Sequence, residues 1–166
     1  MKVFVILLSV ALVAFNASAR VGETSEQAVT RYGPALDTHA GSYSNTIVCE
    51  YKMAGIRVMA TFFTTASGKS VIGEIKYSLP LQMAQSNEVA KVVLLQLLEA
   101  NSDGQHWEMI HNRPVTQDYT RPGATATVEP ALLTVALTEY AAFAEAEKSR
   151  LVTEQGRRID SHLKDF

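Results

Sequence analysis

The sequence predicts an α+β fold, in which an antiparallel sheet of a three-stranded meander plus a second hairpin carries helices mainly on one face. Residues 46–79 contain three alternating runs rich in Val, Ile, Thr, Phe and Tyr, which is typical of strands. Residues 87–100 are apolar around much of a helical circumference, which is typical of a buried helix. The expected order is helix, three strands, helix, two or three strands, helix, and this order indicates an α+β protein.

The first 19 residues have the pattern of a secretory signal peptide. Lys2 gives a positive start, residues 3–15 are apolar, and small residues precede the expected cut between Ala19 and Arg20. The apolar run is too short to span a membrane; the alternative is a buried N-terminal helix. We therefore expect a secreted or periplasmic protein that keeps no membrane attachment once the signal peptide is removed.

The rest of the chain is predicted to form a single α+β domain over residues 20–152, followed by a charged helical tail over residues 153–166. The 15 basic and 17 acidic residues give a net charge of −2 without a basic stripe, which argues against nucleic acid as a partner. Cys49 is the one cysteine, so no disulfide can form within the chain. The fold must therefore rest on its hydrophobic core.

The first expected helix covers residues 25–32. Thr24 is a natural N-cap, and Gln27 stands at the capping-box position three residues later. Gly33 and Pro34 then end the helix. Residues 35–45 contain Gly and Ser and are expected to form a loop that leads into the meander.

The register of the meander follows from its first turn. A two-residue loop at residues 54–55 places Tyr51 opposite Val58 and keeps the apolar faces together. A three-residue loop would place Lys52 opposite Ile56 and mix the faces, because a shift of one residue turns a strand over. The sequence therefore predicts the two-residue loop.

The opposite face of the meander carries apolar residues among charged ones. If they stay exposed, they form a patch suited to a protein partner or to self-association. The alternative is that the C-terminal helix covers this face. The four candidate interface residues are Val48, Met59, Phe63 and Ile72.

The second expected helix, residues 87–100 with Ser86 as its N-cap, should lie across the apolar face of the meander. Leu94 or Leu95 should then be buried against Phe62 and Ile75.

Residues 106–111 are expected to form a strand and residues 112–123, which contain two prolines, a loop. Residues 124–128 and 132–138 should form the second hairpin. An alternative description of the whole order is two half-repeats of helix plus strands, beginning near residues 24 and 86.

The last helix is expected to begin at Thr138 and to turn Tyr140, Phe143 and Ala144 inward. Its end carries an apolar stripe at Val152, Ile159, Leu163 and Phe166. This stripe belongs either to a solvated tail or to a helix that docks on a partner or on a second copy.

Four segments resemble a group of small uncharacterised secreted bacterial proteins: GETSEQAVTRYGP (22–34), AGIRV (54–58), LLEANSDGQHW (97–107) and LLTVALTEY (132–140). The resemblance implies secretion and brings no activity with it. The element order also resembles the type III secretion chaperone fold. Those chaperones are cytoplasmic, and the leader contradicts that role, so this second resemblance implies a topology alone.

Common catalytic and cofactor patterns are not found. Gly68-Lys69-Ser70 lacks the upstream glycine of a P-loop and lies in a strand-to-strand turn. His106 and His111 are spaced so that they diverge on either a strand or a helix, so no metal site is predicted. Cys49 alternates in phase with core residues and is expected to be inert. We assign no catalytic residue and no cofactor.

The leading hypothesis is a non-catalytic binding or interaction module. The second is a small hydrolase or ligand-binding protein with a site beside the 112–123 loop, because long irregular loops often carry function. Four residues would supply stacking, a base and hydrogen-bonding groups in such a site: Trp107, His111, Asp118 and Tyr119.

Overall fold

The computed structural model describes the backbone of residues 20–163 and the side chains of residues 20–157. The predicted signal peptide lies outside the described residues, as do the side chains of Ile159, Leu163 and Phe166. The elements are α2 (Ser25–Tyr32), β1 (Asp37–Ala40), β2 (Ile47–Met53), β3 (Ile56–Thr64), β4 (Ser70–Ser78), α3 (Leu81–Ala84), α4 (Asn87–Ala100), β5 (Glu108–Asn112), β6 (Gln117–Arg121), β7 (Ala124–Glu129), β8 (Leu132–Leu137) and α5 (Thr138–Leu163).

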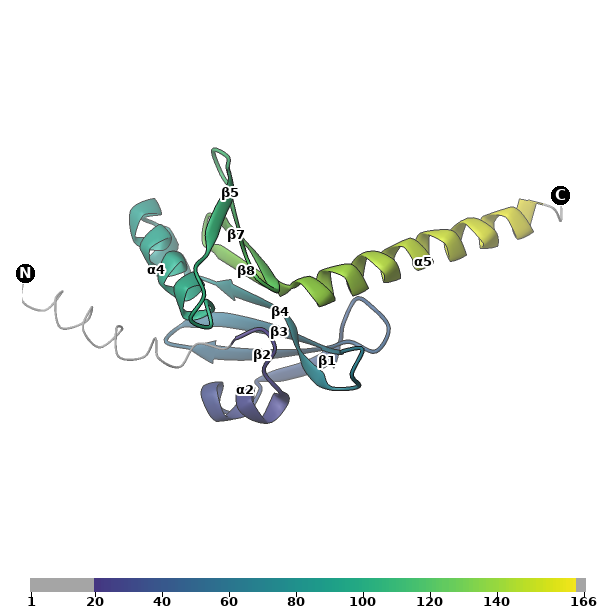
Figure 1. Cartoon of the computed structure of the whole chain (residues 1–166), viewed down its shortest axis with the longest axis horizontal. Coiled ribbons are helices and arrows are strands. Elements are labelled where there is room, and N and C mark those ends of the chain that lie inside the picture. The colour runs from purple at the N-terminus through teal and green to yellow at the C-terminus, as the bar shows by residue number, and fades with distance from the viewer. Residues whose placement is uncertain (1–19, 164–166) are drawn as a thin grey trace, which may run out of the picture.

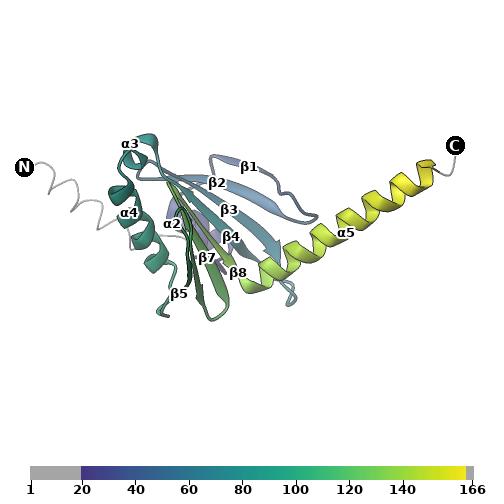
Figure 2. The same cartoon turned by 90° about the horizontal axis from the view of Figure 1, so that it is seen from above.

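All eight strands form one antiparallel sheet in the order β1-β2-β3-β4-β8-β7-β6-β5 (Figures 1 and 2). The α+β class is therefore confirmed, and the sheet is larger than predicted. Each half of the chain is a helix followed by four strands, α2 with β1–β4 and α4 with β5–β8. The halves meet where β4 pairs with β8, Ile75 opposite Val135 and Tyr77 opposite Leu133.

Two strands lie in segments that were expected to be loops. β1 occupies part of residues 35–45, and β6 occupies part of residues 112–123. All four residues of β1 are exposed, so this edge strand carries no apolar alternation that would reveal it. In β6 only Tyr119 is buried, because the strand lies near the other edge of the sheet.

The N-terminal helix has the predicted bounds and caps. The Gln27 N–H donates to the Thr24 hydroxyl (3.4 Å), and the Thr24 N–H donates to the Gln27 side-chain oxygen (2.8 Å), which completes the capping box. Gly33 ends the helix with φ of 81°, and the buried Ala28 of α2 packs into the core.

The predicted register of the meander is confirmed, since Tyr51 lies opposite Val58. The turn residues Ala54 and Gly55 have φ of 49° and 86°. Positive values at both positions match the twist of the adjoining strands in a two-residue hairpin loop.

The prediction that Ile72 lies on the exposed face is wrong, because a β-bulge interrupts the alternation at the start of β4. Thr61 pairs with Glu74 and Phe62 with Ile72, so Gly73 is the extra residue. A bulge shifts the alternation of the strand by one, and Ile72 therefore points into the core. Phe63 is buried as well. Two of the four residues predicted to form an exposed interface are thus buried. The other two, Val48 and Met59, are half-buried.

Helix α4 has its predicted bounds and its Ser86 cap, whose hydroxyl accepts from the Val89 N–H (3.4 Å). It packs chiefly on β7 and β8 rather than on the meander. Leu94 is buried in the same cluster as Phe62 and Ile75, as expected. Leu95 is half-buried at the edge of that cluster.

Tyr77 and Asn101 join the two halves inside this core. The Asn101 amide donates to the Tyr77 hydroxyl (3.0 Å) and to the Leu97 carbonyl (2.8 Å). Burial raises the pKa of Tyr77 to about 12. The phenol therefore stays neutral and acts as a hydrogen-bonding group between β4 and the end of α4.

Helix α5 packs on a second, smaller cluster with Phe63 and Val71 through Tyr140, Phe143 and Ala144. Phe62 belongs to the main core and Phe63 to this cluster, and successive residues of a strand point to opposite faces. The helices are therefore not confined to one face, and α5 covers part of the face where the exposed patch was predicted.

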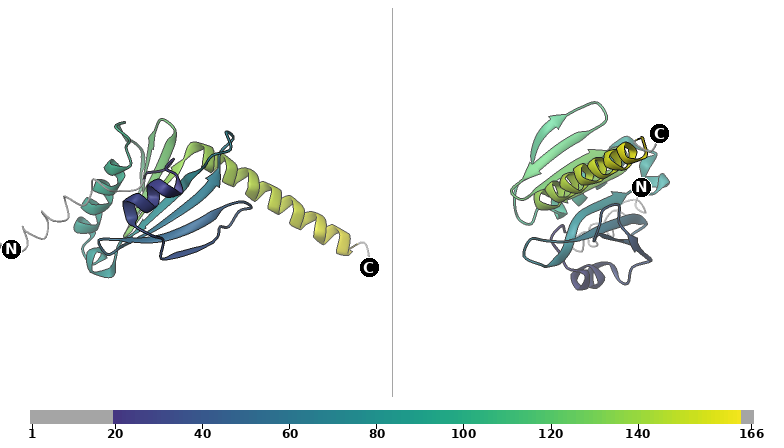
Figure 3. Two further views of the ribbon diagram at one scale, coloured as in Figure 1. Left: turned by 90° about the horizontal axis from the view of Figure 1, so that it is seen from below. Right: turned by 90° about the vertical axis from the view of Figure 1, so that its right-hand side faces the viewer.

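Beyond its first turns α5 projects from the sheet as a long single helix (Figures 1 and 3). Farther along the helix, the Arg150 side chain donates a hydrogen bond to the Ser44 hydroxyl (3.2 Å). The helix runs through residue 153 without a break. Val152, from the predicted stripe, is 64% exposed. Across the described residues, no helix has the length and apolar content needed to cross a membrane.

Candidate functional site

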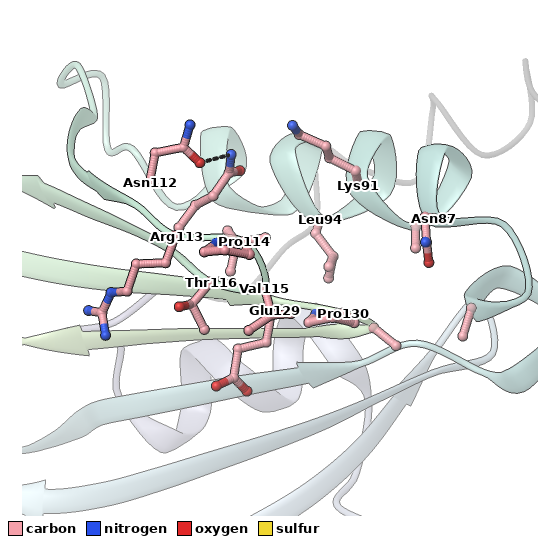
Figure 4. A pocket seen from close by; sticks show the side chains of 15 residues that line it. Asn87, Lys91, Leu94, Asn112, Arg113, Pro114, Val115, Thr116, Glu129 and Pro130 are labelled. Atoms are coloured by element: carbon pink, nitrogen blue, oxygen red, sulfur yellow. Dashed lines mark hydrogen bonds between the residues drawn. The ribbon is translucent and has the colours of Figure 1, made fainter.

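A groove of about 630 Å³ lies at one end of the sheet, between α4 and two hairpin turns, and we call it the α4 groove (Figure 4). One wall is α4 with the end of α3, and the other is formed by the β5–β6 and β7–β8 turns. Its lining residues are Ala84, Asn87, Ala90, Lys91, Leu94, Asn112, Arg113, Pro114, Val115, Thr116, Gln117, Val128, Glu129, Pro130 and Ala131.

The helix wall follows from residue spacing. Asn87, Ala90, Lys91 and Leu94 recur at i, i+3, i+4 and i+7, which places them on one face of α4. Ala90 and Leu94 are buried where this face meets the sheet. The same helical face therefore contributes both to the core and to the floor of the groove.

Backbone hydrogen bonds fix the two turns. In the β5–β6 turn the Arg113 N–H donates to the Thr116 carbonyl (2.8 Å). In the β7–β8 turn Ala131 has φ of 63°, and its carbonyl accepts from the Leu79 N–H (2.9 Å). The β5–β6 turn is thus held by a hydrogen bond within itself, and the β7–β8 turn by one from the residue that follows β4.

The lining combines an apolar centre with polar edges. Leu94, Pro114 and Pro130 face the space between helix and turns (Figure 4). Val115 is 67% exposed although it is apolar. At one end the Gln117 amide donates to the Asn112 side-chain oxygen (3.0 Å), so two amides close that end of the groove. This combination is typical of sites for small ligands.

Lys91 is the cation of the helix wall. It forms no ion pair with any residue of the described part of the chain. Arg113 is bound to Asp118 instead. In Figure 4 the side chains of Arg113 and Glu129 point away from α4. Lys91 is therefore the charge available to a ligand at the wall of the groove.

The predicted pocket residues are not gathered in one pocket. Trp107 is buried, donates to the Leu98 carbonyl (2.9 Å) and lies under the Arg121 guanidinium at 5.1 Å. Tyr119 is also buried, and its hydroxyl donates to the Gln117 side-chain oxygen (3.2 Å). Tyr119 therefore positions a lining residue without itself lining the groove.

His111 and Asp118 do face each other, on neighbouring strands, with 3.6 Å between Nδ1 and Oδ2. Asp118 also binds Arg113 and accepts from the Thr127 hydroxyl (3.0 Å). Burial raises the pKa of Asp118, but the hydrogen bonds from Thr127 and Arg113 and the nearby positive charges outweigh it and hold the pKa below its usual value.

This pair does not have the geometry of an activated nucleophile. The carboxylate lies between the Thr127 hydroxyl and the His111 imidazole. A nucleophile needs its base within hydrogen-bond reach, with the carboxylate behind the base. The observed order instead makes Asp118 an anchor for the β5–β6 hairpin.

Residues 112–117 of the lining fall within the 112–123 segment proposed for the alternative site, but none of the four residues named for that site lines the α4 groove. The sequence analysis did not predict the helix wall, because the spacing of Asn87, Lys91 and Leu94 is what any buried helix would show. No pattern along the chain signals their juxtaposition with turns that come later in the sequence, after another strand. Among the described residues, no group of three or more His, Cys, Asp or Glu side chains could hold a metal ion.

Comparison of the chain with protein-family models, with curated proteins and with solved structures finds no match. Both resemblances noted in the sequence therefore stay predictions.

Proposed function

We propose that this is an exported, non-catalytic binding protein that holds a small amphipathic ligand with an acidic group in the α4 groove. The observation that carries the proposal is a groove of about 630 Å³ with an apolar centre and with Lys91, which has no ion-pair partner among the described residues, on its wall. Small-ligand sites commonly have volumes of about 300–1,000 Å³, an apolar lining and a few polar groups that set orientation.

The charges favour an anion over a cation. Lys91 has no carboxylate partner in the described residues, whereas Glu129, the acidic lining residue, points away from α4 (Figure 4). The exposed Val115 and the two turn prolines offer apolar surface to the body of the ligand. The amides of Asn112 and Gln117 can hydrogen-bond to its polar end.

Titration calorimetry with sodium dodecanoate tests this proposal, with dodecan-1-ol as the uncharged analogue. We expect a 1:1 complex with dodecanoate and weaker binding of the alcohol. Lys91→Gln should weaken dodecanoate binding about three- to fivefold, as for a partly exposed ion pair. Lys69→Gln, in the β3–β4 turn, is the matched control and should have no effect.

The apolar contribution is tested separately with Val115→Ser. Because Val115 is exposed, the substitution should leave stability unchanged and weaken both dodecanoate and dodecanol. Absence of binding by either probe, or equal binding by wild type, Lys91→Gln and Val115→Ser, would overturn the proposal.

We also propose that the chain is exported with removal of residues 1–19. The pattern at positions 2–19 supports this step. Intact mass measurement of protein from the periplasm or medium should give a chain beginning at Arg20. A mature protein that retains Met1 would contradict export by this route.

A further inference from the structure

Strand β5 is an edge of the sheet that nothing in residues 20–163 covers. It is last in the strand order and pairs with β6 alone. All five of its residues are exposed. A strand with a single neighbour directs the N–H and C=O groups of its other edge outward, and these groups can pair with another strand.

Natural edge strands usually carry features that prevent such pairing, and β5 has a bulge and one glutamate. Its sequence, Glu-Met-Ile-His-Asn, has neither lysine nor proline. Met109 is 47% exposed and Ile110 is 48% exposed. Edge β1, by comparison, is only four residues long and has no large apolar residue.

The bulge in β5 leaves one residue of the strand unpaired with β6. Met109 pairs with Tyr119 and His111 with Asp118, so Ile110 has no partner on β6. The extra residue of a bulge stays outside the ladder. Its backbone groups and its apolar side chain are therefore both open to a second strand.

We propose that β5 pairs antiparallel with β5 of a second copy, about a two-fold axis at Ile110. This register places Ile110 opposite Ile110, Met109 opposite His111 and Glu108 opposite Asn112. No like charges face each other, which is what a cross-strand pair requires. The contact is self-complementary and closes at two copies, and it joins the two sheets into one.

A foreign extended peptide could use the same edge, but in the two-fold register Ile110 meets its own copy and no like charges face each other, which favours a second copy. Pairing of β5 with β1 of another copy would instead be head-to-tail and would produce open-ended assemblies. The oligomeric state therefore distinguishes the two-fold contact from both alternatives.

Light scattering after size-exclusion chromatography of the mature chain, over a range of concentrations, tests the proposal. We expect a dimer for wild type and a monomer for Ile110→Lys, because two lysines would meet on the axis. Thr38→Lys, on the exposed edge β1, is the matched control and should remain dimeric. Melting curves should show that all three proteins fold, since both substituted side chains are on the surface.

An experiment that exchanges the charge at position 110 provides the decisive test. Ile110→Lys and Ile110→Glu should each be monomeric, whereas their equimolar mixture should form a dimer, because lysine then faces glutamate. A monomeric wild type at all concentrations overturns the proposal. So does a dimer that Ile110→Lys leaves intact, or a chain of copies that Thr38→Lys disrupts as well.

Discussion

Tyr140 of α5 packs directly on the backbone of Gly73, the bulged residue of β4. A Cβ atom placed on Gly73 would lie 2.5 Å from Tyr140 Cδ2 and 2.6 Å from Phe63 Cδ1. The Tyr140 and Phe63 rings meet edge-on with centroids 5.2 Å apart. The missing side chain of Gly73 therefore makes the space in which α5 meets the sheet.

Gly73→Ala should loosen this contact. Both clashing atoms belong to buried rings in a packed cluster, so we expect a loss of about 1–3 kcal/mol in the free energy of unfolding. Gly156→Ala is the control, because nothing lies within 4 Å of a Cβ there. On an exposed helical position it should cost nothing and favour the helix locally. Urea unfolding measures both, and a neutral Gly73→Ala would show that α5 does not rest on the bulge.

The packing of α4 against the core can be tested by substituting two neighbouring leucines. Leu94 is buried and Leu95 is half-buried. Leu94→Ala should therefore cost about 2–5 kcal/mol of stability, and Leu95→Ala clearly less. Urea unfolding of both variants provides the comparison. If both variants lose the same free energy of unfolding, or if Leu94→Ala loses less than about 1 kcal/mol, then Leu94 does not lie on the face of α4 that packs into the core.

Local sequence signals predicted the elements whose determinants are themselves local. The capping box of Thr24 and Gln27 defined α2, and the turn at residues 54–55 defined the register of Tyr51 and Val58. By contrast, β1 lacks an apolar face because it is an exposed edge, so its strand depends on pairing with β2. Its existence is a tertiary effect that alternation along the chain cannot reveal.

The predictions about the exposed interface and about the groove failed for the same reason, because both depend on tertiary contacts. The bulge at Gly73 depends on how β3 pairs with β4, and it alone reverses the direction of Ile72. The α4 groove combines a helix wall around Lys91 with turns around Val115 and Pro130. The sequence indicated the 112–123 segment through its polar, proline-containing composition, but not the helix wall across the groove.

Asp118 should make the stability of the fold depend on pH at the acid end. Its folded-state pKa lies below the usual 3.8, chiefly through hydrogen bonds from Thr127 and Arg113 that outweigh the effect of burial. A depressed pKa contributes stability above pH 3.8, and this contribution disappears as the pH falls through the folded-state pKa.

Asp118→Asn should therefore be less stable than wild type at pH 7, and the difference should shrink steadily below pH 3.8. Urea midpoints measured from pH 7 downward provide the test. Glu145→Gln is a suitable control, since its pair with Lys148 is exposed at 4.0 Å and contributes little. A difference for Asp118→Asn that stays constant with pH would exclude the ionised carboxylate as the cause.

Helix α5 should exchange its amide hydrogens in two distinct parts. Its first turns are held by Tyr140 and Phe143 and by the Ala66 N–H, which donates to Glu139 (2.9 Å). The part after Arg150 projects from the body, and a short helix without packing is marginal in water. Hydrogen exchange should show slow amides up to about residue 150 and fast ones from 153 to 163. Uniformly slow exchange would show that the projecting part is packed in solution.

The first residues after the predicted cut are anchored in the fold. The Gly22 N–H donates to the Ile72 carbonyl (2.7 Å), and the Ile72 N–H donates to the Glu23 carbonyl (2.8 Å). The Glu23 carboxylate is buried, accepts from Arg31 Nε (3.2 Å) and Nη2 (2.5 Å), and also accepts from the Arg20 backbone N–H (3.3 Å). The predicted cleavage would turn that amide into an ammonium group beside a carboxylate.

A chain that begins at Arg20 should therefore be more stable than one that keeps Ala19. A hydrogen bond to a charged donor is stronger than one to a neutral amide, and one extra residue moves the ammonium about 3.8 Å along the chain. We expect a difference of about 1 kcal/mol in urea unfolding. Glu23→Gln should lower the stability of both chains and remove the difference between them. If the difference persists in Glu23→Gln, the new amino group does not act through Glu23.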